Sequence, residues 1–194
     1  MLKNSKNYAS AKLKFWIEME IAICGQSLPP FENSILKKAY EIGSEIASKN
    51  CILRFGGCNG YPYEAAKGAF ENNGKVVAIS PAKNREEHVN AYNFPIDNFT
   101  EIDFTGFGIP GRNIPLVVNS DAVVLISGQI GTLNEFTIAF HQRKIIGILE
   151  ESGGITSLIK QISEICKKVG EEDKFVYDSS PKNLIERISN SNNQ

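Results

Sequence analysis

The residues best suited to chemistry lie between Asp121 and Glu135, where an apolar run, a glycine turn and a helical sequence follow one another. Residues 122–126 are all apolar, which is typical of a strand buried on both faces, and residues 127–131 predict a turn into a helix beginning near Thr132. Such a junction can hold a phosphate, because glycine lets the backbone approach an anion and the first helical turn presents free amides. Glu135 is predicted to lie in that first turn, beside the bound group.

The segment Thr132-Leu-Asn-Glu135 also matches a capping box, in which threonine and glutamate satisfy the unpaired amides at a helix start. On the local sequence, both a helix cap and a ligand cradle explain the pattern. The choice between them depends on what else converges on the same edge of the fold.

The composition is that of a globular chain of about one domain. Its 194 residues are 42% hydrophobic and 22% charged, which is enough apolar surface to bury a core without disulfides. The 21 basic and 22 acidic residues give a formal charge of -1, so there is no electrostatic argument for nucleic acid or a membrane surface as the main partner.

The cysteines and histidines do not form a metal-binding pattern. Cys24, Cys51, Cys58 and Cys166 include no Cys-x-x-Cys pair, and the two histidines are isolated in sequence. We therefore expect no metal site and a reduced, cytoplasmic protein. The apolar patch at residues 15–23 is interrupted by two glutamates and does not resemble a signal peptide, and no run reaches transmembrane length.

The rest of the chain alternates apolar strands with helical segments. Residues 1–16 are rich in lysine and asparagine and are predicted to form a flexible N-terminal arm, followed by one domain over residues 17–190. Strands are expected at residues 19–24, 51–55, 75–79, 99–104, 122–126, 144–149 and 175–177. Helices are expected at residues 32–48, 64–72, 114–119, from 132, 155–169 and 181–188, with irregular loops at 80–96 and, because of its glycines, at 106–113.

This alternation predicts an α/β fold, a single Rossmann-like, doubly wound parallel sheet with helices on both faces. In such sheets ligands bind beyond the carboxyl ends of the strands, where the strand order reverses. The turns at residues 24–27, 56–60 and 127–131 all follow strands and are expected at that edge. Their convergence favours a nucleotide-like ligand over a helix cap alone.

Four segments of the chain form a pattern found in a known family: Cys24-Gly-Gln-Ser27, Arg54-Phe-Gly-Gly-Cys-Asn-Gly60, Gly111-Arg-Asn113, and Ser120-Asp-Ala-Val running on to Gly131-Thr-Leu-Asn-Glu135. This pattern, over about residues 20–165, resembles the LOG family, often mislabelled lysine decarboxylases. The best-characterised members of that family are cytokinin riboside 5'-monophosphate phosphoribohydrolases. The most specific part is the Gly-x-x-Gly-Thr-x-x-Glu signature after a strand, together with an upstream arginine loop.

The resemblance implies a Rossmann-like homodimer or larger oligomer that binds a nucleoside monophosphate and needs no cofactor. It also implies that Glu135 and Arg112 act at the ribose and the N-glycosidic bond. Cleavage of this bond develops positive charge on the ribose, which a carboxylate can stabilise while it orients water, and an arginine can hold the phosphate. The nucleotide-binding positions implied by the match are Gly25, Gln26, Ser27, Gly56, Gly57, Gly60, Gly128, Gln129, Ile130, Gly131 and Thr132.

Three positions depart from the family pattern. Ser127-Gly-Gln129 stands where Pro-Gly-Gly is usual, so a bulky side chain replaces the second glycine. Tyr61-Pro-Tyr63 follows the second glycine turn where Leu-Met-Gly is usual, and Asn113 follows the arginine in place of lysine. The third change, together with a shortened catalytic loop, resembles a divergent branch of uncharacterised nucleotide-binding relatives that includes a molybdenum-cofactor carrier protein.

Two functions therefore remain open. One is hydrolysis of a nucleoside 5'-monophosphate to free base and ribose 5-phosphate, which Arg112 and Glu135 favour. The other is a non-catalytic nucleotide sensor or carrier of a phosphorylated pterin, which Gln129 and the Tyr61-Pro-Tyr63 turn favour. DNA handling is a third class, but the chain lacks its basic surface signature. Structural roles stay open as well: Arg112 as an ordinary loop arginine, Gly56, Gly57 and Gly60 as packing glycines, and Asp121 as a structural residue. For Tyr61 and Tyr63, both a place in the core and a place flanking a bound base stay open.

Overall fold

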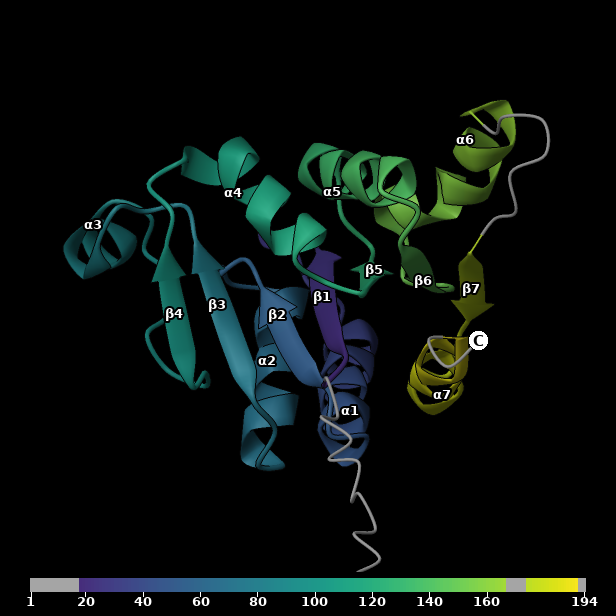
Figure 1. Cartoon of the computed structure of the whole chain (residues 1–194), viewed down its shortest axis with the longest axis horizontal. Helices are drawn as coiled ribbons and strands as arrows, with labels where there is room; N and C mark the ends of the chain where they lie inside the picture. The colour runs from purple at the N-terminus through teal and green to yellow at the C-terminus, as the bar shows by residue number, and fades with distance from the viewer. Residues whose placement is uncertain (1–17, 167–173, 192–194) are drawn as a thin grey trace, which may run out of the picture.

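Seven parallel strands form one sheet in the computed structural model, which describes residues 18–166 and 174–191 (Figure 1). The strands are β1 Glu20–Gly25, β2 Ile52–Phe55, β3 Val76–Ser80, β4 Glu101–Phe104, β5 Ala122–Ile126, β6 Ile145–Leu149 and β7 Phe175–Asp178. Their spatial order is β4-β3-β2-β1-β5-β6-β7, so the chain winds outward from β1 in one direction and from β5 in the other. This order confirms the predicted doubly wound, Rossmann-like α/β fold.

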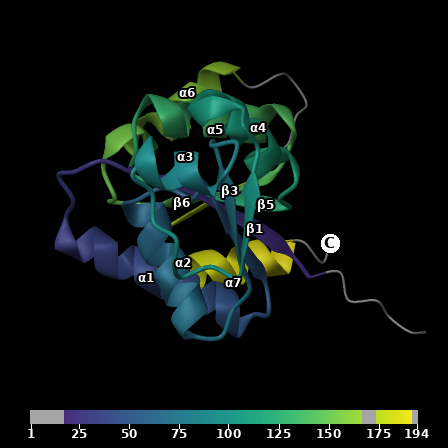
Figure 2. The same cartoon turned by 90° about the vertical axis from the view of Figure 1, so that its left-hand side faces the viewer.

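Helices cover both faces of the sheet (Figures 1 and 2). They are α1 Asn33–Ser48, α2 Tyr61–Glu71, α3 Arg85–Asn90, α4 Gly108–Val118, α5 Ile130–His141, the 3-10 helix η1 Gly154–Leu158, α6 Ile159–Cys166 and α7 Pro181–Ser191. Alternation along β1 separates two cores, because Ile21 and Ile23 pack with α1, α2 and α7 while Ala22 and Cys24 pack with α4, α5 and α6.

The strand order reverses between β1 and β5. Gly25 at the end of β1 pairs with Ile126 at the end of β5, and a Cβ on Gly25 would lie 2.4 Å from the carbonyl oxygen of Ile126. Glycine therefore lets the two strand ends meet. The turns after β1, β2 and β5 emerge at this one edge, as the sequence predicts.

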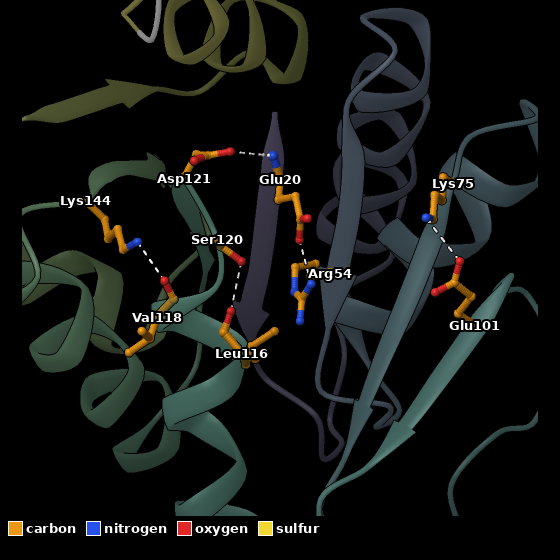
Figure 3. Close-up of polar contacts among 9 residues, drawn as sticks. All are labelled: Glu20, Arg54, Lys75, Glu101, Leu116, Val118, Ser120, Asp121 and Lys144. Carbon is orange, nitrogen blue, oxygen red and sulfur yellow. Dashed lines mark hydrogen bonds and ion pairs between the residues drawn. The ribbon is translucent and has the colours of Figure 1, made fainter. Parts of the chain in front are cut away.

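The opposite edge, at the amino ends of the strands, is closed by polar contacts (Figure 3). Asp121 Oδ2 accepts a hydrogen bond from the Glu20 N–H (2.8 Å), and Arg54 forms an ion pair with the Glu20 carboxylate. Lys144 Nζ donates to the carbonyl oxygen of Val118 at the end of α4. These contacts give Asp121 a structural role, at the edge away from the glycine turns.

The capping-box interpretation of Thr132 and Glu135 is wrong. Helix α5 begins earlier than predicted, at Ile130, and its N-cap is Gln129. Glu135 therefore lies in the second turn rather than the first. Its carboxylate pairs with Arg112 of α4 instead of a backbone amide, because a buried carboxylate gains more from a charged partner than from a cap.

Helix α3 forms where the sequence predicts an irregular loop, and α4 begins at Gly108, within the predicted loop 106–113 and ahead of the predicted helix at 114–119. Helix α3 begins at an asparagine cap, since Asn84 Oδ1 accepts a hydrogen bond from the Glu87 N–H (2.9 Å). Helix α4 includes two glycines, but Pro110 stands in its first turn, where no intrahelical N–H bond is lost. Burial of Leu116 and Val117 against the sheet offsets the low helix propensity of glycine.

The predicted N-terminal arm, residues 1–16, and the end of the predicted helix at 155–169 lie outside the described residues. The described part of that helix is divided into η1 and α6. Over residues 18–166 and 174–191, no helix combines the length and apolarity that crossing a bilayer requires.

Candidate functional site

A cavity of about 390 Å³ opens at the carboxyl ends of β1 and β2, between the β1–α1 loop, α4 and α5. Exposed apolar side chains such as Leu28, Ile109 and Ile130 line its mouth, and the buried Arg112 and Glu135 line its interior. A cavity of this size suits a small molecule of nucleotide dimensions. It is lined by Ile23, Gly25, Gln26, Ser27, Leu28, Pro29, Gly56, Cys58, Pro62, Ile109, Arg112, Asn113, Gln129, Ile130, Gly131, Thr132 and Glu135.

The amino terminus of α5 forms one wall of the cavity. Gln129, the N-cap, and the first helical residues Ile130, Gly131 and Thr132 all line it, and within the described chain no side-chain hydrogen bond caps this end. The first amides of a helix have no partner inside the helix, and the helix dipole makes them attractive to an anion. A Cβ built on Gly131 meets no atom within 4 Å, so the space in front of these amides is open.

The turn before α5 is held in an unusual backbone conformation. Ser127 has a φ of 55° and Gly128 a φ of 92°, two consecutive residues in the region that favours glycine. A Cβ on Gly128 would lie 2.1 Å from Thr132 Oγ1, so glycine also allows the turn to pack against the helix. Gly128 therefore supports the cavity wall by packing against Thr132 and does not itself line the cavity.

A buried ion pair occupies the interior of the cavity. Arg112 Nη1 lies 3.1 Å from Glu135 Oε1, and each side chain is 7% exposed. The pair joins α4 to α5, so it depends on how these helices pack. Among the described residues Arg112 Nε has no hydrogen-bond partner although it is buried. Buried donors are almost always paired, so the arginine keeps a hydrogen-bonding capacity that the described residues do not use.

Gly56 in the β2–α2 turn makes room for the arginine. A Cβ at this position would lie 2.1 Å from Arg112 Cζ, inside the guanidinium group. The guanidinium therefore lies directly against the backbone of the turn. This contact gives Gly56 a specific role that sequence spacing does not reveal.

Burial controls the protonation of the groups beside the pair. Burial raises the pKa of the Glu135 carboxyl, although the charge of Arg112 and hydrogen bonds from Cys24 and Arg112 partly lower it. Burial and the nearby Glu135 carboxylate raise the pKa of the Cys24 thiol well above its ordinary value, and burial also raises that of Cys58. Both thiols are therefore neutral near pH 7 and are poor nucleophiles.

Asn113, next to Arg112 in α4, extends the polar interior. Its side-chain amide lies 2.8 Å from Asn134 Oδ1. With the amide turned the other way, its nitrogen donates to Glu135 Oε1 at 3.3 Å and to the carbonyl oxygen of Ile109 at 3.2 Å. Asn113 is 2% exposed. Its amide is uncharged, so it is a buried, neutral neighbour of Glu135.

The structure brings most of the predicted binding residues together, and places three glycines elsewhere. Gly57 has a φ of 66° and packs beneath α3, where a Cβ would lie 3.2 Å from His88 Cε1. Gly60 starts α2, where a Cβ would lie 2.2 Å from the carbonyl oxygen of Gln26. These two glycines, with Gly128, support the turns by close packing, which is the structural alternative raised for Gly57 and Gly60.

Tyr61 and Tyr63 belong to the packing of α2. The Tyr61 hydroxyl accepts a hydrogen bond from the Glu32 N–H (3.0 Å), and the Tyr63 hydroxyl donates to Asp97 (2.6 Å). The alternative in which these rings flank a bound base is therefore not supported by their contacts.

Sequence reasoning missed several wall residues. Cys58 and Asn113 lie within or beside the quoted motifs, so their position could have indicated them. Leu28, Pro29, Ile23, Pro62 and Ile109 carry no local signal and reach the cavity through tertiary packing. In the described chain, no group of three or more histidine, cysteine or acidic residues could hold a metal ion.

Residues 18–185 match the profile of the SLOG cluster 4 family. An uncharacterised protein of Archaeoglobus fulgidus is 30% identical over 132 residues, which cover 68% of this chain and 80% of that protein. The family match supports the resemblance to LOG-like proteins that the glycine turns and the Gly-x-x-Gly-Thr-x-x-Glu signature indicate.

Two solved structures show the same fold. The molybdenum cofactor binding protein of the phototrophic bacterium Rippkaea orientalis is 26% identical, with a TM-score of 0.74 over 90% of this chain and 97% of that one. The molybdenum cofactor carrier protein of Chlamydomonas reinhardtii is 22% identical, with a TM-score of 0.74 over 91% of this chain and 99% of that one. These similarities confirm the predicted placement in the branch that includes such carriers.

Proposed function

Because the chain belongs to the SLOG cluster 4 family and its cavity contains a buried Arg112–Glu135 pair, we propose that it binds a phosphorylated, nucleotide-like small molecule. The observation that carries this proposal is that the pair and the uncapped amino terminus of α5 line one cavity. An anion site and a charged pair side by side suit a ligand with a phosphate and a sugar or heterocycle.

The phosphate is placed at the amino terminus of α5. The amides at Ile130, Gly131 and Thr132 and the Thr132 hydroxyl are the donors available there. The Arg112 guanidinium, which also lines the cavity, supplies a further charged donor. Helix dipole, threonine and arginine together provide an anion site without a metal ion.

The ribose is placed against Glu135, and the reaction proposed is hydrolysis of the N-glycosidic bond of a nucleoside 5'-monophosphate. Water adds its hydroxyl to the anomeric carbon and its proton to the leaving base, which yields ribose 5-phosphate and free base. A carboxylate at this position stabilises positive charge on the ribose and orients the water. This role requires the ionised form of Glu135, which burial disfavours by raising the pKa and which Arg112 favours at 3.1 Å.

Transport of a phosphorylated pterin without turnover is the second candidate. The similar protein of Rippkaea orientalis is described as binding the molybdenum cofactor, which supports this alternative. Gln129 supports it as well, because its side chain lines the wall where an approaching substrate would meet the turn. In this case the cofactor is cargo, and its phosphate occupies the same α5 site.

The test is incubation of the purified protein with a panel of nucleoside 5'-monophosphates, with released base followed by chromatography and binding by calorimetry. Glu135→Gln is measured beside Glu164→Gln, which changes an exposed glutamate of α6. Base release that is lost in Glu135→Gln and retained in Glu164→Gln supports the hydrolase.

Binding of a nucleotide or a pterin phosphate without base release supports a sensor or carrier and excludes hydrolysis for that panel. If the protein binds no phosphorylated ligand, the proposed function is wrong.

The proposal also includes a cytoplasmic homodimer or larger oligomer, one domain over residues 17–190, and no nucleic-acid or membrane partner. Sedimentation of the purified chain measures the oligomeric part.

A further inference from the structure

The loop between β6 and η1 packs behind the turn that leads into α5. Ser152 in this loop is 4% exposed, and its Oγ accepts a hydrogen bond from the Ser127 N–H at 2.8 Å. The same hydroxyl donates to the carbonyl oxygen of Leu149 at 2.7 Å. Because its proton and a lone pair are both engaged, the hydroxyl is held in one orientation.

The same loop also holds the carbonyl of Gly128. The Ile155 N–H donates to this oxygen at 2.8 Å, which directs the negative end of the carbonyl dipole into the loop. Gly154 permits this approach, because a Cβ there would lie 2.4 Å from the Gly128 oxygen. A carbonyl oxygen that faced the α5 amides would repel an anion bound there. Because the Gly128 carbonyl points into the loop instead, its orientation favours anion binding.

The turn needs such support because its backbone conformation is costly. Ser127 is not glycine and has a φ of 55°, which costs about 1–3 kcal/mol unless the surroundings stabilise it. The hydrogen bond from the Ser127 amide to Ser152 holds the backbone at that residue, while the Ser127 hydroxyl donates to Gln26 Oε1 at 3.3 Å.

We propose that Ser152 is a positioning residue for the anionic group of the ligand, an inference that rests on the proposed function. Ser152 acts through Ser127 and holds the turn so that the first amides of α5 face the cavity. It reaches the site from the β6–η1 loop, outside the glycine signature and the arginine loop.

The test compares Ser152→Ala with Ser157→Ala in the full-length protein. Ser157 is a matched control, because it lies in η1, is exposed, and donates to the carbonyl oxygen of Gly154 on the outer side of the loop. Ribose 5-phosphate is the probe, measured by calorimetry. Ser152→Ala is expected to bind it about tenfold more weakly, the loss of roughly one well-aligned hydrogen bond, whereas Ser157→Ala binds as the wild type does.

A second measurement separates positioning from general destabilisation. Amide hydrogen exchange in the ligand-free proteins is expected to become faster at Ser127 in Ser152→Ala and to stay unchanged in Ser157→Ala. Ser152→Cys, which keeps a weaker hydrogen-bonding group of similar size, is expected to be intermediate in both measurements, and it replaces Ser152→Ala if the alanine variant does not fold.

The outcomes are distinguishable. Weaker binding together with faster Ser127 exchange supports the inference. Unchanged binding, or weaker binding without faster Ser127 exchange, overturns it while the proposed function stands. Failure of the wild type to bind ribose 5-phosphate or any phosphorylated compound of the panel overturns the proposed function, and the positioning role with it.

Discussion

At the scale of residues, the site depends on a buried carboxyl group whose pKa burial raises and Arg112 lowers. Glu135 is paired with Arg112 at 3.1 Å, and the neutral Cys24 thiol and Asn113 amide lie beside it. Removing one member of a buried pair typically costs about 3–5 kcal/mol, because the other charge is left without compensation. Taking both charges out of water also costs free energy that their attraction does not always exceed, so a ligand-binding or catalytic role explains the pair better than stability does.

The raised pKa of Glu135 predicts a pH-dependent stability. A folded-state pKa above the unfolded value means that the folded protein holds the proton more tightly, so the free energy of unfolding falls as the pH rises from about 4.5 towards that raised pKa. Above the raised pKa the loss is complete. We expect the wild type to lose stability relative to Glu135→Gln over this interval.

Denaturant unfolding of both proteins between pH 4 and pH 8 measures this difference, with about 1.4 kcal/mol expected for each unit by which folding raises the pKa. A difference that does not change with pH would show that Arg112 and burial cancel, and one that grows in favour of the wild type as the pH rises would show that Arg112 outweighs burial.

At the scale of elements, the amino terminus of α5 is the feature that a substitution can test without disturbing the packing. Gly131 lies in the first turn, and a Cβ there meets no atom within 4 Å. Gly131→Glu is expected to lower affinity for a phosphorylated ligand about a hundredfold, since a carboxylate a few ångströms from the phosphate repels it. Gly131→Gln has the same size and no charge, so it is expected to lower affinity much less.

The expected effect of Gly131→Glu on stability is opposite to its effect on affinity. An acidic side chain near a helix amino terminus stabilises the helix by about 0.3–1 kcal/mol, and replacing a helical glycine adds a similar amount. Gly131→Glu is thus expected to unfold at the same temperature as the wild type or higher while binding less. Equal loss of affinity in the two variants would mean that bulk, rather than the anion site, is responsible.

At the scale of the whole molecule, the ligand is expected to stabilise the fold because its cavity joins elements from both halves of the sheet. A ligand at about 100 times its Kd adds about 2.7 kcal/mol to the free energy of unfolding, and for a chain of this size each kcal/mol raises Tm by about 2–4 °C. Scanning calorimetry with a nucleoside monophosphate measures the shift. Single-stranded DNA at low salt is expected to give none, since the formal charge is -1. A rise in Tm induced by DNA would instead support DNA handling, the third function considered from the sequence.

Much of this molecule follows from local sequence. The run of apolar residues in β5 predicts a strand buried on both faces, and all five of its residues are buried. The alternation of strands and helices predicts the doubly wound sheet, because parallel strands need crossover connections. The same reasoning places the three glycine turns at one edge. Local pattern suffices here because strand burial and turn formation depend on neighbouring residues.

Other features required the tertiary structure. Helix α4 forms despite its glycines because Leu116 and Val117 are buried on the sheet, and Glu135 pairs with Arg112 instead of capping α5. The contact of Gly56 with the guanidinium and the support of Ser127 by Ser152 join segments far apart in the chain. Sequence by itself determined the seven strands, the glycine turns at their ends and most of the helices. The tertiary structure decided which side chains meet, because sheet order and helix packing bring distant residues into contact.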